Sequence, residues 1–434
     1  DENDSWGVAL SADYRLADGH VLTSITGYRN AKRRVGSDED GSPGYGLHVA
    51  YFNDEFRHFT QELRLASPSS QAFRYVIGGF FFNQKGEQAR DAFFGPAFGA
   101  PADTLAATGA ASVDTTSSAA FVNANLDLTG SVSVNGGVRY THERKEALIS
   151  QTGSPAGLAD FVDYSDSFSE GDVTATASLQ YRASRRALAY ASYARGHKSG
   201  GFNVDYVSDP SFIPFDSESV DSFEIGLKSD LIDNRLRLNI AAFHARYHDF
   251  QVFQFQSVGM TTLLVASNAA SVRTRGVEIE TEIRFADGLK LTYGVGYADA
   301  GFVDFPGGAR DDPGAPVNIA GNALPRAPKV TAGGMLRYDF ALGAAADGAF
   351  TVSHGYRGEQ FFNPDNRERT RDDGYHLVNL SLDIDIGRHW GVGVWARNVT
   401  DATYRTNRGV SFLGIPFSLY GQPRTFGGEI RARF

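Results

Sequence analysis

His244 and His248 are the two histidines whose spacing could bind a metal ion. Side chains four residues apart on a β-strand share a face, and two imidazoles on one face can coordinate a cation such as Zn²⁺. The flanking Arg246 favours another interpretation, in which both histidines lie on a polar strand near a rim. The chain has no cysteine, which excludes cysteine-ligated metals and thiol catalysis. We therefore predict no metal site.

A row of acidic side chains is formed by Glu278, Glu280 and Glu282. Paired carboxylates can act as general acid and base, but a strand that lines a polar interior also presents such a row, paired with basic side chains of its neighbours. The glycine-rich segment 196–201 lacks the strand-to-helix context and the Lys-Ser/Thr pair of a phosphate-binding loop. We therefore predict that the protein is no enzyme and holds no cofactor.

The elements that carry these residues show a period of two, which predicts β-strands. In segment 378–386, aliphatic residues at even positions alternate with Asn, Ser and Asp at odd positions. The same alternation recurs at 122–128, 223–228 and 277–285. One apolar and one polar face per strand is the pattern of a transmembrane β-barrel, so we predict an all-β, antiparallel, up-and-down barrel.

The connections between these strands alternate in length. Short turns are expected at 17–19, 67–70, 129–130, 184–185, 232–234, 286–288 and 387–388, and long loops at about 34–55, 86–113, 148–168, 199–218, 250–270, 303–327, 360–374 and 402–422. Short turns on one side and long loops on the other are typical of outer-membrane barrels. About 17 strands are expected, from about 5–16 to about 424–434. Both end strands should run inward, and since complete barrels have even strand numbers, we expect at least one further strand before residue 1.

The composition narrows the class of protein further. The chain has 434 residues, a net charge of −10, 48 Gly, 32 Phe and 19 Tyr, and a mean hydropathy of −0.28. The net charge argues against nucleic acid as a main partner. No run approaches the roughly 18–20 apolar residues of a membrane-spanning helix. A soluble β-propeller would show a repeat of about 40–50 residues, and no such repeat is visible.

Several segments, in order along the chain, carry a resemblance to one family. They are 61–67 (QELRLAS), 190–203 (YASYARGHKSGGFN), 218–228, 268–280, 324–329 (LPRAPK), 398–404 (NVTDATY) and 423–427 (PRTFG). Together they resemble the barrels of TonB-dependent outer-membrane receptors, over essentially the whole chain, 1–434. The motif residues with expected structural roles are Gly196, Lys198, Gly200, Gly201, Phe202, Asn203, Gly276, Glu278, Pro325, Asn398, Asp401, Tyr404 and Phe434.

The resemblance implies a location and an activity. Family barrels have 22 strands in the outer membrane of Gram-negative bacteria, so about 17 would be present here, without the N-terminal plug and TonB box. The family takes up scarce nutrients, most commonly ferric siderophores, with energy from the TonB complex acting on the plug. Outer-membrane lipid surrounds the barrel, and a last strand ending in Phe434 resembles the signal for the barrel-assembly machinery. The alternative function is a passive, porin-like channel.

Substrate-binding residues are expected in the long outer loops, where aromatic walls and a few polar groups can surround a ligand. The candidates are Tyr45, Phe93, Tyr206, Phe212, Phe361, Arg367 and Arg369, with Phe94, Phe215, Phe362 and Arg371 as further loop residues. The three arginines at alternate positions could attract an anionic ligand through charge-assisted hydrogen bonds.

Overall fold

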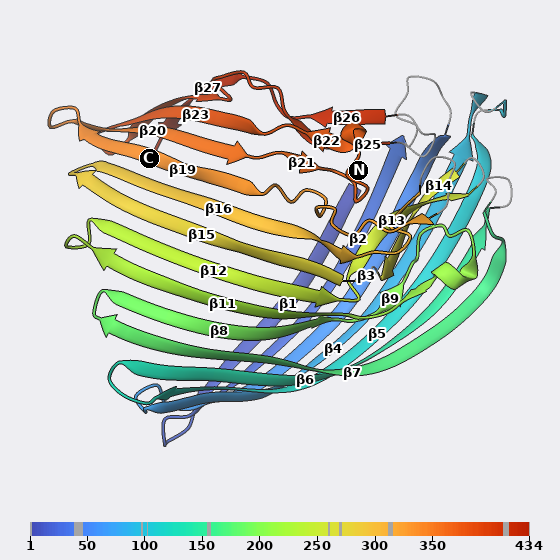
Figure 1. Ribbon diagram of the computed structural model, residues 1–434, viewed down its shortest axis with the longest axis horizontal. Coiled ribbons are helices and arrows are strands. Elements are labelled where there is room, and N and C mark those ends of the chain that lie inside the picture. The colour runs from blue at the N-terminus through green and yellow to red at the C-terminus, as the bar shows by residue number, and fades with distance from the viewer. Residues whose placement is uncertain are drawn as a thin grey trace.

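The protein forms one large antiparallel β-sheet that curls around an interior (Figure 1). This computed structural model describes residues 2–38, 47–96, 99–101, 103–153, 158–258, 261–268, 271–310, 316–410 and 416–433. The sheet strands are β1 (Glu2–Arg15), β2 (Val21–Asp38), β3 (Leu47–Ala66), β4 (Phe73–Phe94), β5 (Thr104–Asp127), β6 (Val132–Thr152), β7 (Phe161–Ser184), β8 (Ala187–Lys198), β11 (Glu218–Leu231), β12 (Leu236–His248), β15 (Ser271–Ala286), β16 (Leu289–Asp304), β19 (Val330–Ala341), β20 (Ala346–Arg357), β23 (Tyr375–Ile386), β24 (Trp390–Arg397) and β27 (Thr425–Ala432). The sheet has 17 strands, as predicted.

Each strand of the sheet pairs with the next one along the chain, which makes an up-and-down meander. At one end, which we call the turn end, the strands join through tight turns. Gly288 shows why such turns need glycine, because its φ is +79° and a Cβ there would lie 2.1 Å from the Asp339 carbonyl oxygen.

The opposite end, which we call the loop end, carries the long connections and small elements of their own. These are the hairpins β9 (Gly201–Phe202) with β10 (Pro214–Phe215), β13 (Gln251–Val258) with β14 (Thr261–Asn268), β17 (Ala309–Arg310) with β18 (Pro316–Val317), β21 (Gln360–Phe361) with β22 (Arg371–Asp372) and β25 (Arg405–Val410) with β26 (Pro416–Tyr420), and the 3₁₀-helices η3 (Pro210–Phe212) and η4 (Glu368–Thr370). In the part of the chain that is described, no helix has the length and apolar character to cross a membrane.

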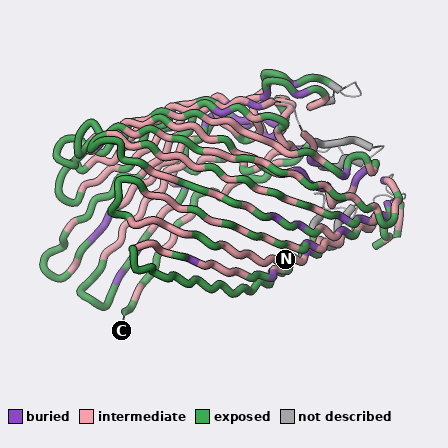
Figure 2. The backbone as a smooth tube through the Cα atoms, turned by 90° about the horizontal axis from the view of Figure 1, so that it is seen from below, coloured by how far each residue is buried: buried purple, intermediate pink, exposed green. Residues whose placement is uncertain are grey.

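The pairing register gives the sheet an apolar outward face. Figure 2 shows exposed and half-buried residues alternating along the strands. Large apolar side chains such as Ile225 (63% exposed) and Ile430 (75% exposed) cover the outward face. An apolar surface of this extent is unfavourable in water and favourable in contact with lipid. The predicted transmembrane face of the barrel is therefore present.

Two borders of aromatic side chains frame this apolar band. At the border nearer the loop end, ring centroids of cross-strand pairs lie 5.4 Å apart for Trp6–Tyr28, 6.4 Å for Phe59–Phe81 and 5.0 Å for Tyr193–Phe223. At the turn end, exposed rings are contributed by Tyr14, Phe73, Tyr181, Phe285, Tyr338 and Trp390. Tyr and Trp prefer the membrane–water interface, so these two girdles mark the borders of the bilayer.

The strands β3 to β7 are 20–24 residues long and extend into segments that were expected to be loops. The prediction of long loops at 34–55, 86–113 and 148–168 was therefore wrong over most of those ranges. The error has a physical cause. Beyond the outer girdle the outward face turns from apolar to charged, as at Lys85 and Glu87, and the strands continue on backbone pairing and cross-strand ion pairs.

Candidate functional site

A segment of the chain folds back across the inner face of the tall wall formed by β4 to β7. It comprises residues 199–217, between β8 and β11, and we call it the inner strap. Its apolar residues Phe202, Val207 and Ile213 pack against a patch of the wall. That patch comprises the buried residues Ala111, Ala147 and Ile149. The hydrophobic effect thus holds the strap inside the barrel, at the loop end.

A buried arginine links the middle of the strap to the wall. Arg90 of β4 donates to Asp54 of β3 at 2.6 Å, and both side chains are less than 10% exposed. The same guanidinium donates from Nε to the carboxylate of Asp205 in the strap at 2.9 Å. It also lies over the Phe52 ring, 4.7 Å from the centroid. Arg90 therefore couples two strands of the wall to the strap.

Further polar contacts fix the two sides of the strap. The Lys145 ammonium donates to the Gly200 carbonyl oxygen at 2.6 Å. The Gln151 side chain donates to the Val207 carbonyl oxygen and accepts from the Val207 N–H, both at 2.9 Å. These bonds satisfy backbone groups that would otherwise be buried without partners. The strap is therefore a built element of the interior.

Tyr206 of the strap packs on a second apolar cluster, which includes Ala92 and Ala107, and its hydroxyl donates to the Ala107 carbonyl oxygen at 3.2 Å. Burial raises the pKa of Tyr206 above its ordinary range, and the Asp91 carboxylate raises it further. The neutral form is therefore favoured in the folded chain. The contribution of this contact to stability is fully present below the ordinary pKa of about 10 and is lost as the pH rises through the raised value.

Asn203 joins the strap to the hairpin β13–β14. Its Oδ1 accepts from the Ala266 N–H and its Nδ2 donates to the Ala266 carbonyl oxygen, both at 2.8 Å. Nδ2 also donates to the Phe212 carbonyl oxygen at 2.8 Å. One amide side chain thus completes the backbone hydrogen bonding of two loops, which explains an asparagine at this motif position.

Replacing Asn203 by alanine should loosen the contact between the strap and the hairpin. Three hydrogen bonds disappear and the backbone groups of Ala266 lose their partners, at a cost of about 1–3 kcal/mol. We expect faster proteolysis within 203–217 and 251–268, with the barrel itself still resistant. Asn203→Asp is the matched control, because it keeps the acceptor and loses the donor, and should give an intermediate rate. Equal rates for all three proteins would contradict this assignment.

A second group of candidate residues lies on β21, η4 and β22. Arg371 pairs with Glu359 at 2.7 Å, Glu368 at 3.1 Å and Asp373 at 3.2 Å. The hydrogen bond to Glu359, and after it the hydrogen bond to Glu368, raises the pKa of Arg371 above its ordinary value. Arg367 pairs with Asp365 at 3.3 Å. Arg369 is exposed, and no ion pair joins it to another residue of the described chain. It is therefore the arginine of this group that a ligand could reach without displacing a partner.

The structure places the predicted binding residues in separate surroundings. Tyr206 and Phe212 lie in the strap, and Phe212 is 38% exposed. Phe361 pairs with Arg371 in the β21–β22 ladder. Phe93, expected in a loop, lies instead in β4, where it pairs with Leu105. Tyr45 lies outside the described residues. The strap and the β21–β22 group are thus two candidate ligand contacts at the loop end, and their roles remain predictions.

The histidines and glutamates that were considered for metal binding or acid–base chemistry lie in positions typical of a barrel wall. His244 and His248 are both exposed on the outward face. Among the described residues no three metal-ligating side chains form a cluster. Glu282 pairs with Lys290 at 2.9 Å and Arg284 at 3.2 Å, as expected for an acidic row on the inner wall. The pattern of charges is that of a polar lumen.

The remaining motif residues shape turns and close approaches at the loop end. A Cβ at Gly200 would lie 2.6 Å from the Phe215 carbonyl oxygen, and one at Gly201 would overlap the Phe215 ring. Asn398 is 5% exposed and accepts from the Ala402 N–H at 2.9 Å, which closes the turn after β24. Gly196 and Lys198 lie in β8, Glu278 lies on the inward face of β15, and Pro325 lies in the turn before β19. Asp401 accepts a hydrogen bond from the Arg424 N–H, and Tyr404 stacks on Tyr375. Phe434 lies outside the described residues.

Sequence reasoning missed the residues that anchor the strap. Arg90 and Gln151 lie in segments that were expected to be loops, and Lys145 lies three positions before one of them. Their strap partners are 54 to 115 positions away in the chain. Only the paired wall shows that these positions point inward.

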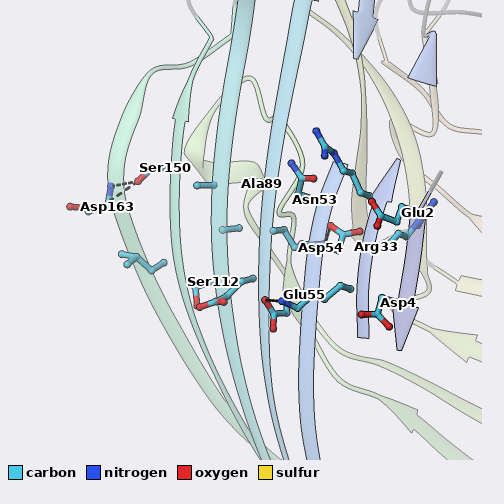
Figure 3. A pocket seen from close by; sticks show the side chains of 17 residues that line it. Glu2, Asp4, Arg33, Asn53, Asp54, Glu55, Ala89, Ser112, Ser150 and Asp163 are labelled. Carbon is cyan, nitrogen blue, oxygen red and sulfur yellow. Dashed lines mark hydrogen bonds and ion pairs between the residues drawn. The ribbon is translucent and has the colours of Figure 1, made fainter. Parts of the chain in front are cut away.

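A cavity of about 640 Å³ lies beside the wall of β1 to β7 (Figure 3). Most of its lining side chains, including Asp4, Glu55 and Ser112, have outward positions in the register. It therefore lies on the outside of the barrel, apart from the strap.

Comparisons with known proteins agree with this architecture. The family described as "TonB dependent receptor-like, beta-barrel" matches residues 1–399. A pesticin receptor of Yersinia enterocolitica is 25% identical over 350 residues, which are 80% of this chain and 47% of that protein. A ferric-pyoverdine receptor of Pseudomonas putida is 22% identical over 382 residues, 84% of this chain and 39% of that protein. This chain therefore spans about half the length of the curated relatives it matches.

Solved structures show the same fold. The ferric yersiniabactin uptake receptor of Yersinia pestis superposes with a TM-score of 0.82 at 19% identity, over 100% of this chain and 61% of that one. A siderophore receptor of Acinetobacter baumannii gives 0.73 at 16% identity, over 99% of this chain and 64% of that one. At these identities the likeness concerns the fold.

Proposed function

Because this chain belongs to the TonB-dependent receptor family of outer-membrane β-barrels, we propose that it forms the wall of a receptor that imports a ferric siderophore with energy delivered through TonB. The loop end then faces the outside of the cell and the turn end the periplasm, as in outer-membrane barrels generally. Coupling to TonB through a plug domain, and assembly through the last strand, belong to the same proposal.

The observation that carries the proposal is the strap held against the inner wall. A porin-type pore needs an open, water-filled interior, whereas here a 19-residue segment (199–217) is fixed inside the barrel by a buried arginine and an apolar cluster. Such a segment can present aromatic and polar groups to a ligand from a fixed position. The matched relatives and similar structures include receptors named for pesticin, ferric pyoverdine and ferric yersiniabactin.

The proposal is tested by ligand binding to the protein isolated from outer membranes of its own host, grown under iron starvation. Ferric siderophores of the catecholate, hydroxamate and mixed phenolate classes are titrated, with vitamin B12, haem and oligosaccharides as other cargoes. Saturable, tight binding of one iron complex supports the proposal. No binding of any cargo, combined with high conductance in planar bilayers, would replace it by the passive channel.

Arg369 is the charged loop residue that we expect to contact an anionic iron complex. Arg369→Gln should weaken binding about tenfold, since one charge-assisted hydrogen bond contributes about 1.5–3 kcal/mol and 1.4 kcal/mol is a factor of ten. The matched control is Arg367→Gln, because Arg367 already pairs with Asp365. A titration in which the control loses as much affinity as Arg369→Gln would remove Arg369 from the proposed site while leaving the function intact.

A further inference from the structure

On one side of the barrel, cations of the outward face just above the outer aromatic girdle pair with carboxylates. On β2 to β4, Lys32 lies 3.4 Å from Glu55, and Arg57 lies 2.8 Å from Glu55 and 3.9 Å from Glu87. Lys85 completes the row at 3.0 Å from Glu87. We call these five residues the paired row; Glu55 is labelled in Figure 3. Each cation of this row lies within 4 Å of a carboxylate, and the two carboxylates are shared among the three cations.

At the same level on β8, β11, β12 and β15 the balance is different. The register aligns Arg195 with Asp221, Asp221 with Arg246, and Arg246 with Arg273. Arg275 follows two positions from Arg273 on the same strand. We call Arg195, Arg246, Arg273 and Arg275 the arginine patch. These side chains face outward, because the intervening Tyr247 and Val272 pack in the interior cluster.

The acids near the patch are already engaged. Asp221 accepts the Tyr193 hydroxyl at 2.6 Å. Asp299 pairs with Arg275 at 3.0 Å and lies 3.8 Å from Arg273. No ion pair joins Arg195 or Arg246 to any other residue that the structure describes, and both are exposed. The patch therefore carries more positive charge than its protein neighbours neutralise.

Two features of the patch are unfavourable for the chain alone. Arg246 and Arg273 are directly opposite across neighbouring strands, and like charges in that position destabilise a sheet. The Nε of Arg273 is buried, and within the described structure it has no hydrogen-bond partner. A buried donor without a partner is costly. Both features would become favourable if an anion were bound between the two guanidinium groups.

The position of the patch identifies the anion. Tyr193 and Phe223 of the outer girdle lie two positions nearer the turn end than Arg195 and Asp221. Girdle rings lie at the headgroup level, so the patch faces the polar zone of the outer leaflet. We propose that the arginine patch binds a phosphate group of the phosphorylated glycolipid of that leaflet, with Arg246 and Arg273 on either side of it. Guanidinium groups suit phosphate because their N–H groups match its oxygens in pairs.

The test uses the protein extracted from outer membranes, titrated by native mass spectrometry with three probes: lipid A, lipid A stripped of its phosphates, and inorganic phosphate. We expect saturable binding of intact lipid A and at least about tenfold weaker binding to Arg246→Gln/Arg273→Gln, since each lost contact to a charged group is worth about a factor of ten. Lys32→Gln/Lys85→Gln, at the same level in the paired row, is the control and should bind as the parent does.

Thermal unfolding in nonionic detergent gives an independent readout, because the substitution that weakens lipid binding should not lower the stability of the lipid-free protein. Without lipid A, Arg246→Gln should unfold at the same or a higher temperature than the parent, because a repulsion is relieved. With lipid A, the parent should gain more stability than the variant. Equal binding of stripped and intact lipid A, equal loss in the control, or binding of inorganic phosphate alone would overturn the proposal. Arg246→Lys/Arg273→Lys, which keeps the charge, remains informative if the glutamine variant does not fold.

Discussion

Replacement of Gly276 by valine is expected to prevent the barrel from accumulating in folded form. Gly276 lies in β15 opposite Phe243 of β12, whose ring covers it. A Cβ at this position would lie 2.1 Å from the Tyr297 carbonyl oxygen of β16 and 2.6 Å from the Phe243 ring. The first contact is with the backbone of a neighbouring strand, so relief requires the strands to separate and the ring to leave. Overpacking alone costs about 1–3 kcal/mol, and lost ladder hydrogen bonds add to it.

The measurement is the heat-modifiable migration of the protein from outer membranes in a denaturing gel, which separates folded from unfolded barrels. Gly294→Ala is the matched control in the adjacent strand, because the nearest atom to its Cβ would be the Ile279 carbonyl oxygen at 3.8 Å, an ordinary contact. We expect the control to fold as the parent does. A folded Gly276→Val barrel at parental levels would show that the strands adjust more easily than these distances imply.

The alternation of side chains was sufficient to predict the sheet. In 378–386 the aliphatic residues at even positions lie outward on β23, and Asp383, at an odd position, meets Arg431 at 3.0 Å on the inner wall. The predicted turn at 286–288 is confirmed by the left-handed Gly288. Such features are local, because a strand face and a turn conformation are decided by residues within a few positions of each other.

The candidate site was much less predictable, and the strap shows why. Motif residues such as Gly201 and Asn203 were identified, but their roles come from Phe215 and Ala266, which follow 14 and 63 positions later. The wall beneath the strap was mistaken for loops because its outward face is charged beyond the girdle. Where both faces of a strand are polar, hydrophobic periodicity no longer marks the strand, and only cross-strand pairing reveals it.

Replacement of Arg90 by methionine should destabilise the wall beneath the middle of the strap and, with it, the proposed ligand contacts. Methionine fills a similar volume and cannot pair, so Asp54, 9% exposed, keeps only the hydrogen bond from Gln88 at 3.2 Å. Removing one partner of a buried ion pair costs about 3–5 kcal/mol, because the other charge is left without compensation. Asp205 also loses its link to the wall. We expect faster proteolysis within 203–209 and at least about tenfold weaker binding of the cargo found for the parent protein.

Asp205→Asn removes the exposed ion pair of Arg90 and leaves the buried one in place. Asp205 is 60% exposed at its side chain, so its pairing with Arg90 should contribute only about 0–1 kcal/mol, and the buried Arg90–Asp54 pair survives the change. Binding and proteolysis of Asp205→Asn should therefore stay close to those of the parent. If Arg90→Met kept full affinity while its strap was cleaved rapidly, the strap would be a packing element and the ligand contacts would lie elsewhere, with the β21–β22 group as the remaining candidate. If both variants lost affinity equally, the exposed carboxylate of Asp205 would itself be a ligand contact, and the buried pair would only hold it in place.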